Sequence, residues 1–128
     1  MSTLKADTIQ STSGGAATLT KQSAAKVWSY LVGTGTAAVV DSFNISSMSD
    51  NGTGDYTNSI SSSLSNGNYA ITIAYGNQSG GWAAQANGQL KYADTPSAGA
   101  YSLTTGNSIS AALNDFARIH SSVNGDLA

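Results

Sequence analysis

Short alternating segments separated by turn dipeptides are the feature that most constrains the fold of this chain. In Tyr69–Tyr75, the apolar residues Tyr69, Ile71, Ile73 and Tyr75 alternate with small or polar ones. A period of two places such residues on one face of a β-strand. Four Asn-Gly dipeptides, which favour tight turns, interrupt the chain between or within segments of this kind. The chain is therefore expected to be all-β, with short antiparallel strands.

About seven or eight short strands are predicted, at the spacing of an antiparallel β-sandwich of jelly-roll-like type. After residue 25 they cover residues 26–32, 37–45, 55–61, 69–75, 82–90, 101–105 and 116–123. We expect the core to contain Tyr69, Ile71, Ile73, Ile119 and either Phe43 or Val40. Residues 109–119 also fit a helix, because Ile109, Leu113 and Phe116 would share a helix face, so strand and helix both stay open there.

Composition supports a β-rich fold. Ser, Thr, Asn and Gly account for 58 of the 128 residues, only 9% of residues are charged, and Glu is absent. Ser, Thr, Asn and Asp compete with the helical backbone for hydrogen bonds, whereas helix surfaces normally carry Glu, Lys, Gln and Arg. Leu, Ile, Val and Phe total only 22 residues. Such a chain builds a narrow sandwich or buries further apolar surface between subunits.

The charge distribution and the absence of an export signal limit the kinds of partner that this chain can bind. The five basic residues are scattered, which predicts no nucleic-acid groove. No Lys/Arg cluster and no apolar run of 18 residues suggests a membrane partner. Met1–Gln10 has no apolar export segment, and cysteine is absent. These features suit a protein that is made in a cytoplasm and later faces the outside as part of a particle.

Motifs for catalysis or cofactor binding are weak, and we expect a protein that is not an enzyme. His120 is the only histidine and has no triad partner nearby in sequence. Residues 33–38 match G-x-G-x-x-A, but a strand pattern follows where a dinucleotide fold needs a helix. Residues 50–55 are rich in oxygen ligands without the spacing of a calcium loop, which favours a hairpin turn. We therefore expect no catalytic residue, no cofactor and no metal.

Aromatic residues are the candidate contact residues. Trp28 and Tyr30 fit a core or a subunit interface better than a sugar-stacking platform, since rings supply much of the buried area of a core poor in aliphatics. The loops at residues 77–82 and 91–101 combine Gly or Pro with aromatic rings. The candidate contact residues on these loops are Trp82, Tyr92 and Tyr101. A packing role for Trp82 is an equally open alternative.

Residues 1–25 differ from the rest of the chain. They are polar, with sparse apolar positions at Leu4, Ile9 and Leu19 and a Gly14-Gly15 pair between two short β-capable runs. Two such strands alone are only marginally stable in water. We expect residues 1–25 to be an extended attachment arm that includes these three apolar residues, and residues 26–128 to be the β-sandwich domain.

Two stretches carry a resemblance to a known family. The opening STLKADTIQSTSGGAATLTKQSAAK resembles the start of short fibre and appendage proteins of marine bacteriophages, especially cyanophages. The run GTGTAAVVDSFNISSMSDNGTGDYTNSISSSLSNGNYAIT resembles a repeated module of the same proteins, and the ending HSSVNGDLA is like their C-termini. The resemblance covers most of the chain and is weakest at residues 79–112.

This resemblance implies a homotrimeric β-structure without catalytic residues, with an attaching N-terminal arm and a distal β-domain that faces the host. Asn58-Ser59 departs from the usual alternation of the family module, which predicts an edge strand there. The expected function is a tail fibre or fibre-like appendage of the virion, assembled in the host cytoplasm. It would contact other virion proteins through residues 1–25, and a glycan or protein of the host surface through the β-domain. The alternative is a head fibre or a capsid decoration protein that stabilises the shell.

Overall fold

The computed structural model describes residues 12–13, 25–76, 86–90, 94–107 and 112–125 of the chain. Within these ranges the secondary structure consists of strands, bridges and turns, without helix. The strands are β1 (Val27–Val32), β2 (Ala38–Phe43), β3 (Ile45–Gly52), β4 (Asp55–Ile60), β5 (Ala70–Gly76), β6 (Ala86–Leu90), β7 (Ala100–Asn107) and β8 (Arg118–Asn124). The all-β expectation is confirmed for the described part of the chain.

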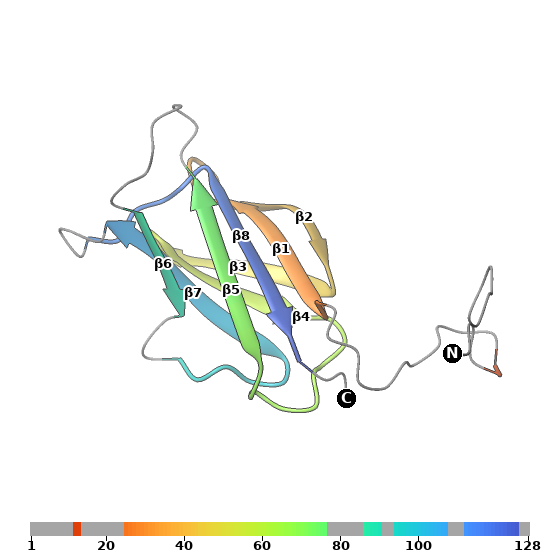
Figure 1. Ribbon diagram of the computed structural model, residues 1–128. Helices are drawn as coiled ribbons and strands as arrows, with labels where there is room; N and C mark the ends of the chain where they lie inside the picture. Colours follow the sequence, from red (N-terminus) through yellow and green to blue (C-terminus); the bar gives the residue numbers. More distant parts are fainter. Residues whose placement is uncertain (1–11, 14–24, 77–85, 91–93, 108–111, 126–128) are drawn as a thin grey trace, which may run out of the picture.

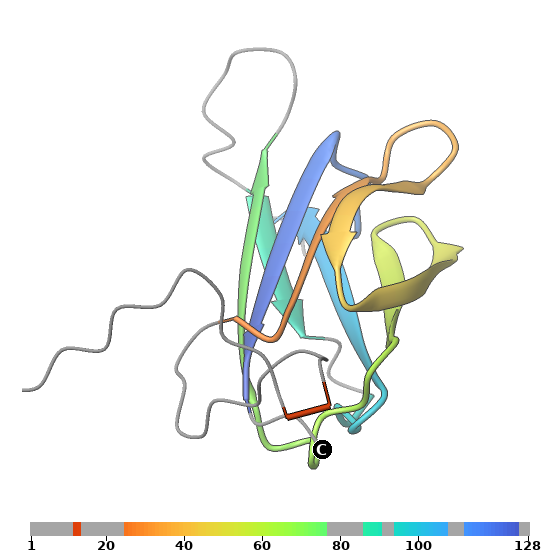
Figure 2. The same ribbon diagram turned by 90° about the vertical axis from the view of Figure 1, so that its right-hand side faces the viewer.

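The strands form two antiparallel sheets that lie face to face (Figure 1). One sheet has the order β2-β1-β8-β5 and the other the order β3-β4-β7-β6, each with four strands. Strands β1–β2 and β3–β4 are neighbours both in sequence and in space, whereas β8 lies between β1 and β5. Figure 2 shows the edge strands β2 and β3 on the same side of the molecule. This layered arrangement is sandwich-like.

Alternating burial follows the alternating sequence. In β4, Tyr56, Asn58 and Ile60 are buried while Asp55, Thr57 and Ser59 are half-buried. In β8 the buried residues are Ile119, Ser121 and Val123, as the period of two predicts. The edge position expected for the strand that contains Asn58 is wrong, because β4 pairs with β3 on one side and with β7 on the other.

Turn residues shape the connections. The β3–β4 hairpin turns at Thr53-Gly54, where Gly54 has a φ of 63° that favours glycine. Asn44 joins β2 to β3 with a φ of 60°, and its side-chain amide donates to the carbonyl oxygens of Lys26 and Ser62. By contrast, Asn87-Gly88 was expected to interrupt its strand, and β6 instead continues through it while pairing with β7.

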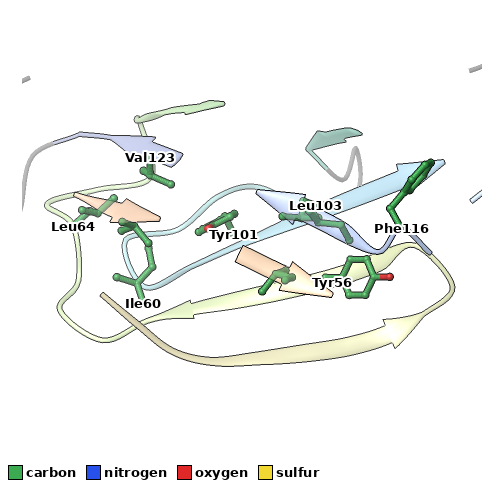
Figure 3. Close-up of a cluster of buried hydrophobic side chains, with 10 residues drawn as sticks. Tyr56, Ile60, Leu64, Tyr101, Leu103, Phe116 and Val123 are labelled. Atoms are coloured by element: carbon green, nitrogen blue, oxygen red, sulfur yellow. The ribbon is translucent and has the colours of Figure 1, made fainter. Parts of the chain in front are cut away.

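Apolar side chains from both sheets form the core between them (Figure 3). Its buried members are Val27, Leu31, Tyr56, Ile60, Leu64, Tyr101, Leu103, Phe116, Ile119 and Val123. Figure 3 shows Tyr101 between a group that contains Ile60, Leu64 and Val123 and one that contains Tyr56, Leu103 and Phe116. Ile119 is thus a core residue as expected.

Other core predictions hold only in part. Tyr69, Ile71 and Ile73 are half-buried and pack against the core from its margin. Phe43 and Val40 were the two alternatives for a further core residue, and both are wrong because each is 55% exposed. They belong to an edge strand that extends past the core. For residues 109–119, the described part from residue 112 holds a bridge at Leu113 and the start of β8, which favours the non-helical alternative.

Candidate interaction surface

The outer face of the sheet β2-β1-β8-β5 carries large rings. Trp28 lies opposite Phe43 of β2, and Tyr30 lies opposite His120 of β8, so these four side chains share the face that points away from the core. Trp28 and Tyr30 are half-buried, while Phe43 and His120 are exposed. The outer face of an antiparallel sheet is normally polar. Aromatic residues at this position are typical of a contact surface.

Tyr30 and His120 stack against each other across the strands. Their ring centroids are 4.5 Å apart and their planes differ by 12°. Each ring therefore covers one face of the other. A sugar platform needs free ring faces, because stacking uses the π face. This pair is better suited to side-by-side packing against another apolar surface.

Strand β2 forms an apolar edge of the same sheet. We define the apolar edge as Val39, Val40 and Phe43, which are 37%, 55% and 55% exposed. The register with β1 passes from Tyr30↔Asp41 to Leu31↔Val39, so Val40 is the extra residue of a β-bulge. Bulges and charges such as Asp41 interrupt strand-to-strand pairing at an edge. The apolar edge therefore suits packing of side chains better than extension of the sheet.

The neighbouring edge strand is polar. In β3, Ser46, Ser47, Ser49 and Asp50 are exposed. Hydrogen bonds of the polar side chains link β3 to its own hairpin, including one of 3.2 Å from Ser46 Oγ to the carbonyl oxygen of Ser59. Two edges on the same side of the molecule thus differ in character, and exposed apolar residues gather on β2 alone of the two.

At the opposite edge of the sheet, the outer face of β5 carries only small side chains. We define the small-residue floor as Ala70, Thr72 and Ala74 of β5, all of which are exposed. They lie opposite Asn124, Ser122 and His120 of β8 respectively. On this outer face the large aromatic side chains of β1 and β8 therefore project farther from the sheet than the small side chains of β5.

The predicted site residues fall in different places. Tyr101 was a candidate host-contact residue, but that prediction is wrong: the side chain is 1% exposed and its hydroxyl lies 2.7 Å from Ser121 Oγ. It points inward because Tyr101 lies opposite Asn58, which is itself an inward-facing residue of β4. Trp82 and Tyr92, and the arm residues Leu4, Ile9 and Leu19, lie outside the described residues.

A buried polar network crosses the core and had no clear sequence signal. Ser29 Oγ and Ser121 Oγ are 2.7 Å apart, and Asn58 donates from Nδ2 to Ser29 Oγ over 3.2 Å. Together with Tyr101 these residues tie β1 and β8 to β4 and β7. Asn58 Oδ1 is buried without a hydrogen-bond partner. Buried polar groups are usually paired, so this amide carries an energetic cost.

A second polar cluster fastens the β3–β4 turn. The carboxylate oxygen Oδ1 of Asp115 accepts hydrogen bonds of 2.6 Å from the Gly54 amide and the Tyr56 hydroxyl. Burial, and secondly the hydrogen bond to Asp115, raises the pKa of Tyr56 well above its usual value. Gly33 lies close to this cluster, since a Cβ there would collide with the Tyr56 hydroxyl. The arrangement closes one end of the core.

A third cluster, at Tyr69, fastens the loop that contains Pro96. The Tyr69 hydroxyl lies 2.9 Å from the carbonyl oxygen of Ser97 and 3.0 Å from that of Ala100. Burial raises the pKa of Tyr69 to about 12. Both tyrosine hydroxyls therefore act as structural hydrogen-bond donors.

The motifs considered for cofactor and calcium binding form turns. Residues 33–37 connect β1 to β2, so a strand follows the glycines. Asp50 Oδ1 accepts a hydrogen bond of 3.0 Å from the Gly52 amide, which is an Asx turn within the hairpin. Within the described ranges, no three His, Asp or Glu side chains lie close enough to hold a metal ion. In the same ranges, no helix is long and apolar enough to cross a membrane.

The fold and the surface together define an all-β protein of two antiparallel sheets, with an apolar edge and an aromatic outer face on one of them. Comparison with models of protein families, with curated proteins and with solved structures found no match.

Proposed function

We propose that this chain is a structural bacteriophage virion protein, a tail fibre or fibre-like appendage that is homotrimeric. In this proposal residues 1–25 attach it to other virion proteins, and the β-domain faces the host surface. The role needs no catalytic residue, cofactor, nucleic acid or membrane. Its place of assembly is the host cytoplasm and its final location is the virion.

The observation that carries the proposal is the apolar edge beside the aromatic outer face. A monomer that works alone normally covers such positions with polar side chains. A subunit of a larger particle keeps them for contacts with its neighbours. The thin aliphatic core agrees with this view, because burial between subunits supplements the core of each one.

The proposal includes a jelly-roll-like fold and an extended N-terminal arm. Eight strands in two four-stranded sheets match the strand number of a jelly roll. Strands β1 and β2 are sequence neighbours within one sheet, and β3 and β4 are sequence neighbours within the other. The extended arm rests on the polar, core-poor sequence of residues 1–25.

Deletion of residues 1–25 tests the attachment role. The buried core residues of the described part lie between Val27 and Val123, so the shortened protein is expected to keep its β-type circular dichroism. It should fail to join particles when it replaces the full chain during infection. The control exchanges Ser47, on the polar edge β3, for Ala. Normal incorporation of the shortened chain would refute attachment through residues 1–25.

The same experiment addresses the alternative of a head fibre or capsid decoration protein. The position of the protein on the particle separates the two functions. A decoration protein is expected to cover the shell in many copies, and its loss would lower the resistance of the particle to heat. Loss of adsorption with an intact shell supports the appendage instead.

A further inference from the structure

The apolar edge consists of apolar side chains that protrude from one border of the sheet. Val40 protrudes because it is the extra residue of the bulge, and Phe43 is the largest exposed apolar side chain of the described residues. Val39 extends the patch along the strand. Large apolar side chains that protrude from an edge need a flat or hollow partner surface.

The small-residue floor offers such a surface on the other border of the same sheet. Ala70, Thr72 and Ala74 leave the backbone of β5 open to close approach. Two strands, β1 and β8, separate the floor from the apolar edge. The edge and the floor of one copy therefore cannot touch each other, whereas those of two different copies can.

The charged side chains also differ between the two patches, with an acidic residue at the apolar edge and basic residues beside the small-residue floor. Asp41 is exposed among the apolar edge residues. Arg118 and His120 are exposed on β8, beside the floor. An acid on one patch and a base on the other would orient two copies and would disfavour contacts between like patches. The Tyr30–His120 stack lies on β1 and β8, between the two patches.

We propose that the apolar edge of one copy packs on the small-residue floor of the next copy, with Asp41 facing Arg118. The two patches differ, so the contact is heterologous and closes into a ring when the rotation between copies allows it. Three copies close the ring that the proposed function requires, and this inference rests on the homotrimer of that proposal.

Charge exchange tests the contact in the full-length chain. We expect sedimentation of the unchanged protein at ~10 μM, a concentration at which specific assemblies persist, to give a trimer. Asp41→Arg and Arg118→Asp should each weaken assembly by about 10-fold or more, as expected for charge pairs at an interface. The double variant Asp41→Arg/Arg118→Asp should regain the trimer, because the charges face each other again.

Two further variants separate assembly from folding. Phe43→Ser removes an exposed ring and should give a folded monomer by circular dichroism and sedimentation. Ser49→Asp adds a charge to the polar edge β3 and should leave the trimer unchanged. A trimer that resists all the charge and Phe43 variants would show that the copies meet elsewhere, and would overturn the inference while leaving a trimeric appendage intact.

A monomeric unchanged protein would overturn both the contact and the homotrimer. The virion role is measured separately, by the location of the protein on particles, so its failure is distinguishable from failure of the contact. If the single charge variants weaken assembly and the double variant does not restore it, Asp41 and Arg118 do not face each other and the proposed geometry is wrong.

Discussion

Replacing Tyr56 by Phe should lower the free energy of unfolding by about 1.5 kcal/mol, the lower end of the range for hydrogen bonds to charged groups. The Tyr56 ring is fully buried, and the mutation removes only its hydroxyl, which lies 2.6 Å from Asp115 Oδ1. The lower end applies because Asp115 is exposed: its carboxylate regains water and keeps the Gly54 amide. Urea unfolding at pH 8, followed by circular dichroism, measures the loss. The control Tyr30→Phe removes the same atom from the outer face.

Alkaline pH gives the same mutation a second readout. The pKa of Tyr56 is raised in the folded protein, so the unfolded chain loses this proton first. The stabilisation is complete below about pH 10, the usual tyrosine pKa, and is lost as the pH rises toward the folded value. One such group adds at most about 1.4 kcal/mol per pH unit to the decline. Tyr56→Phe should show a shallower decline above pH 10. Equal stability at pH 8 and equal slopes would refute the role given to Asp115 and Tyr56.

Three other changes test the interior. Gly33→Ala forces a Cβ against the Tyr56 hydroxyl and should cost about 1–3 kcal/mol, whereas Gly76→Ala meets open space and should be nearly neutral in the same urea assay. Ser121→Ala leaves the Tyr101 hydroxyl buried without its partner and should lower stability by about 1–3 kcal/mol; an unchanged midpoint would contradict the network. Asn58→Leu removes the unpaired Oδ1 together with the hydrogen bond from Nδ2 to Ser29 Oγ, so the gain and the loss should nearly cancel in thermal unfolding; a loss of more than about 2 kcal/mol would show that the amide stabilises the core.

Local patterns predicted seven of the eight described strands because burial and sequence share one period, and they missed β3. The alternation in β4, β5 and β8 indicated which residues face inward, and the structure agrees for Tyr56, Ile119 and Val123. The β3–β4 hairpin followed from Asp, Asn and Gly at positions that need turn geometry. These features depend on residues close together in sequence.

Position within a sheet could not be predicted in the same way. Phe43 and Val40 are apolar and alternate like core residues, yet they lie on an edge strand beyond the core. Asn58 suggested an edge, but β4 is central because it pairs with both β3 and β7, and the hydrogen bond to Ser29 accommodates the polar side chain there. Such outcomes depend on which strands pair, and pairing joins residues far apart in the sequence.

The sequence identified only some of the residues that form the candidate surface. Trp28 and Tyr30 were expected in a core or a subunit interface, and the core alternative is wrong, because pairing with β2 and β8 places both half-buried on the outer face. Tyr101 was assigned to a contact loop because it follows a loop with Gly and Pro. Tyr101 is the second residue of β7 and faces inward, and the sequence around it has no marker for this register.

The central claim is that this chain is a component of a virion appendage. Antibody raised against residues 26–128 and coupled to gold can be applied to intact particles and viewed by electron microscopy. The proposal predicts label confined to the tail or its fibres, with three copies of the chain in each labelled appendage by quantitative mass spectrometry. Label spread over the capsid, or purified particles that lack the chain, would contradict the claim.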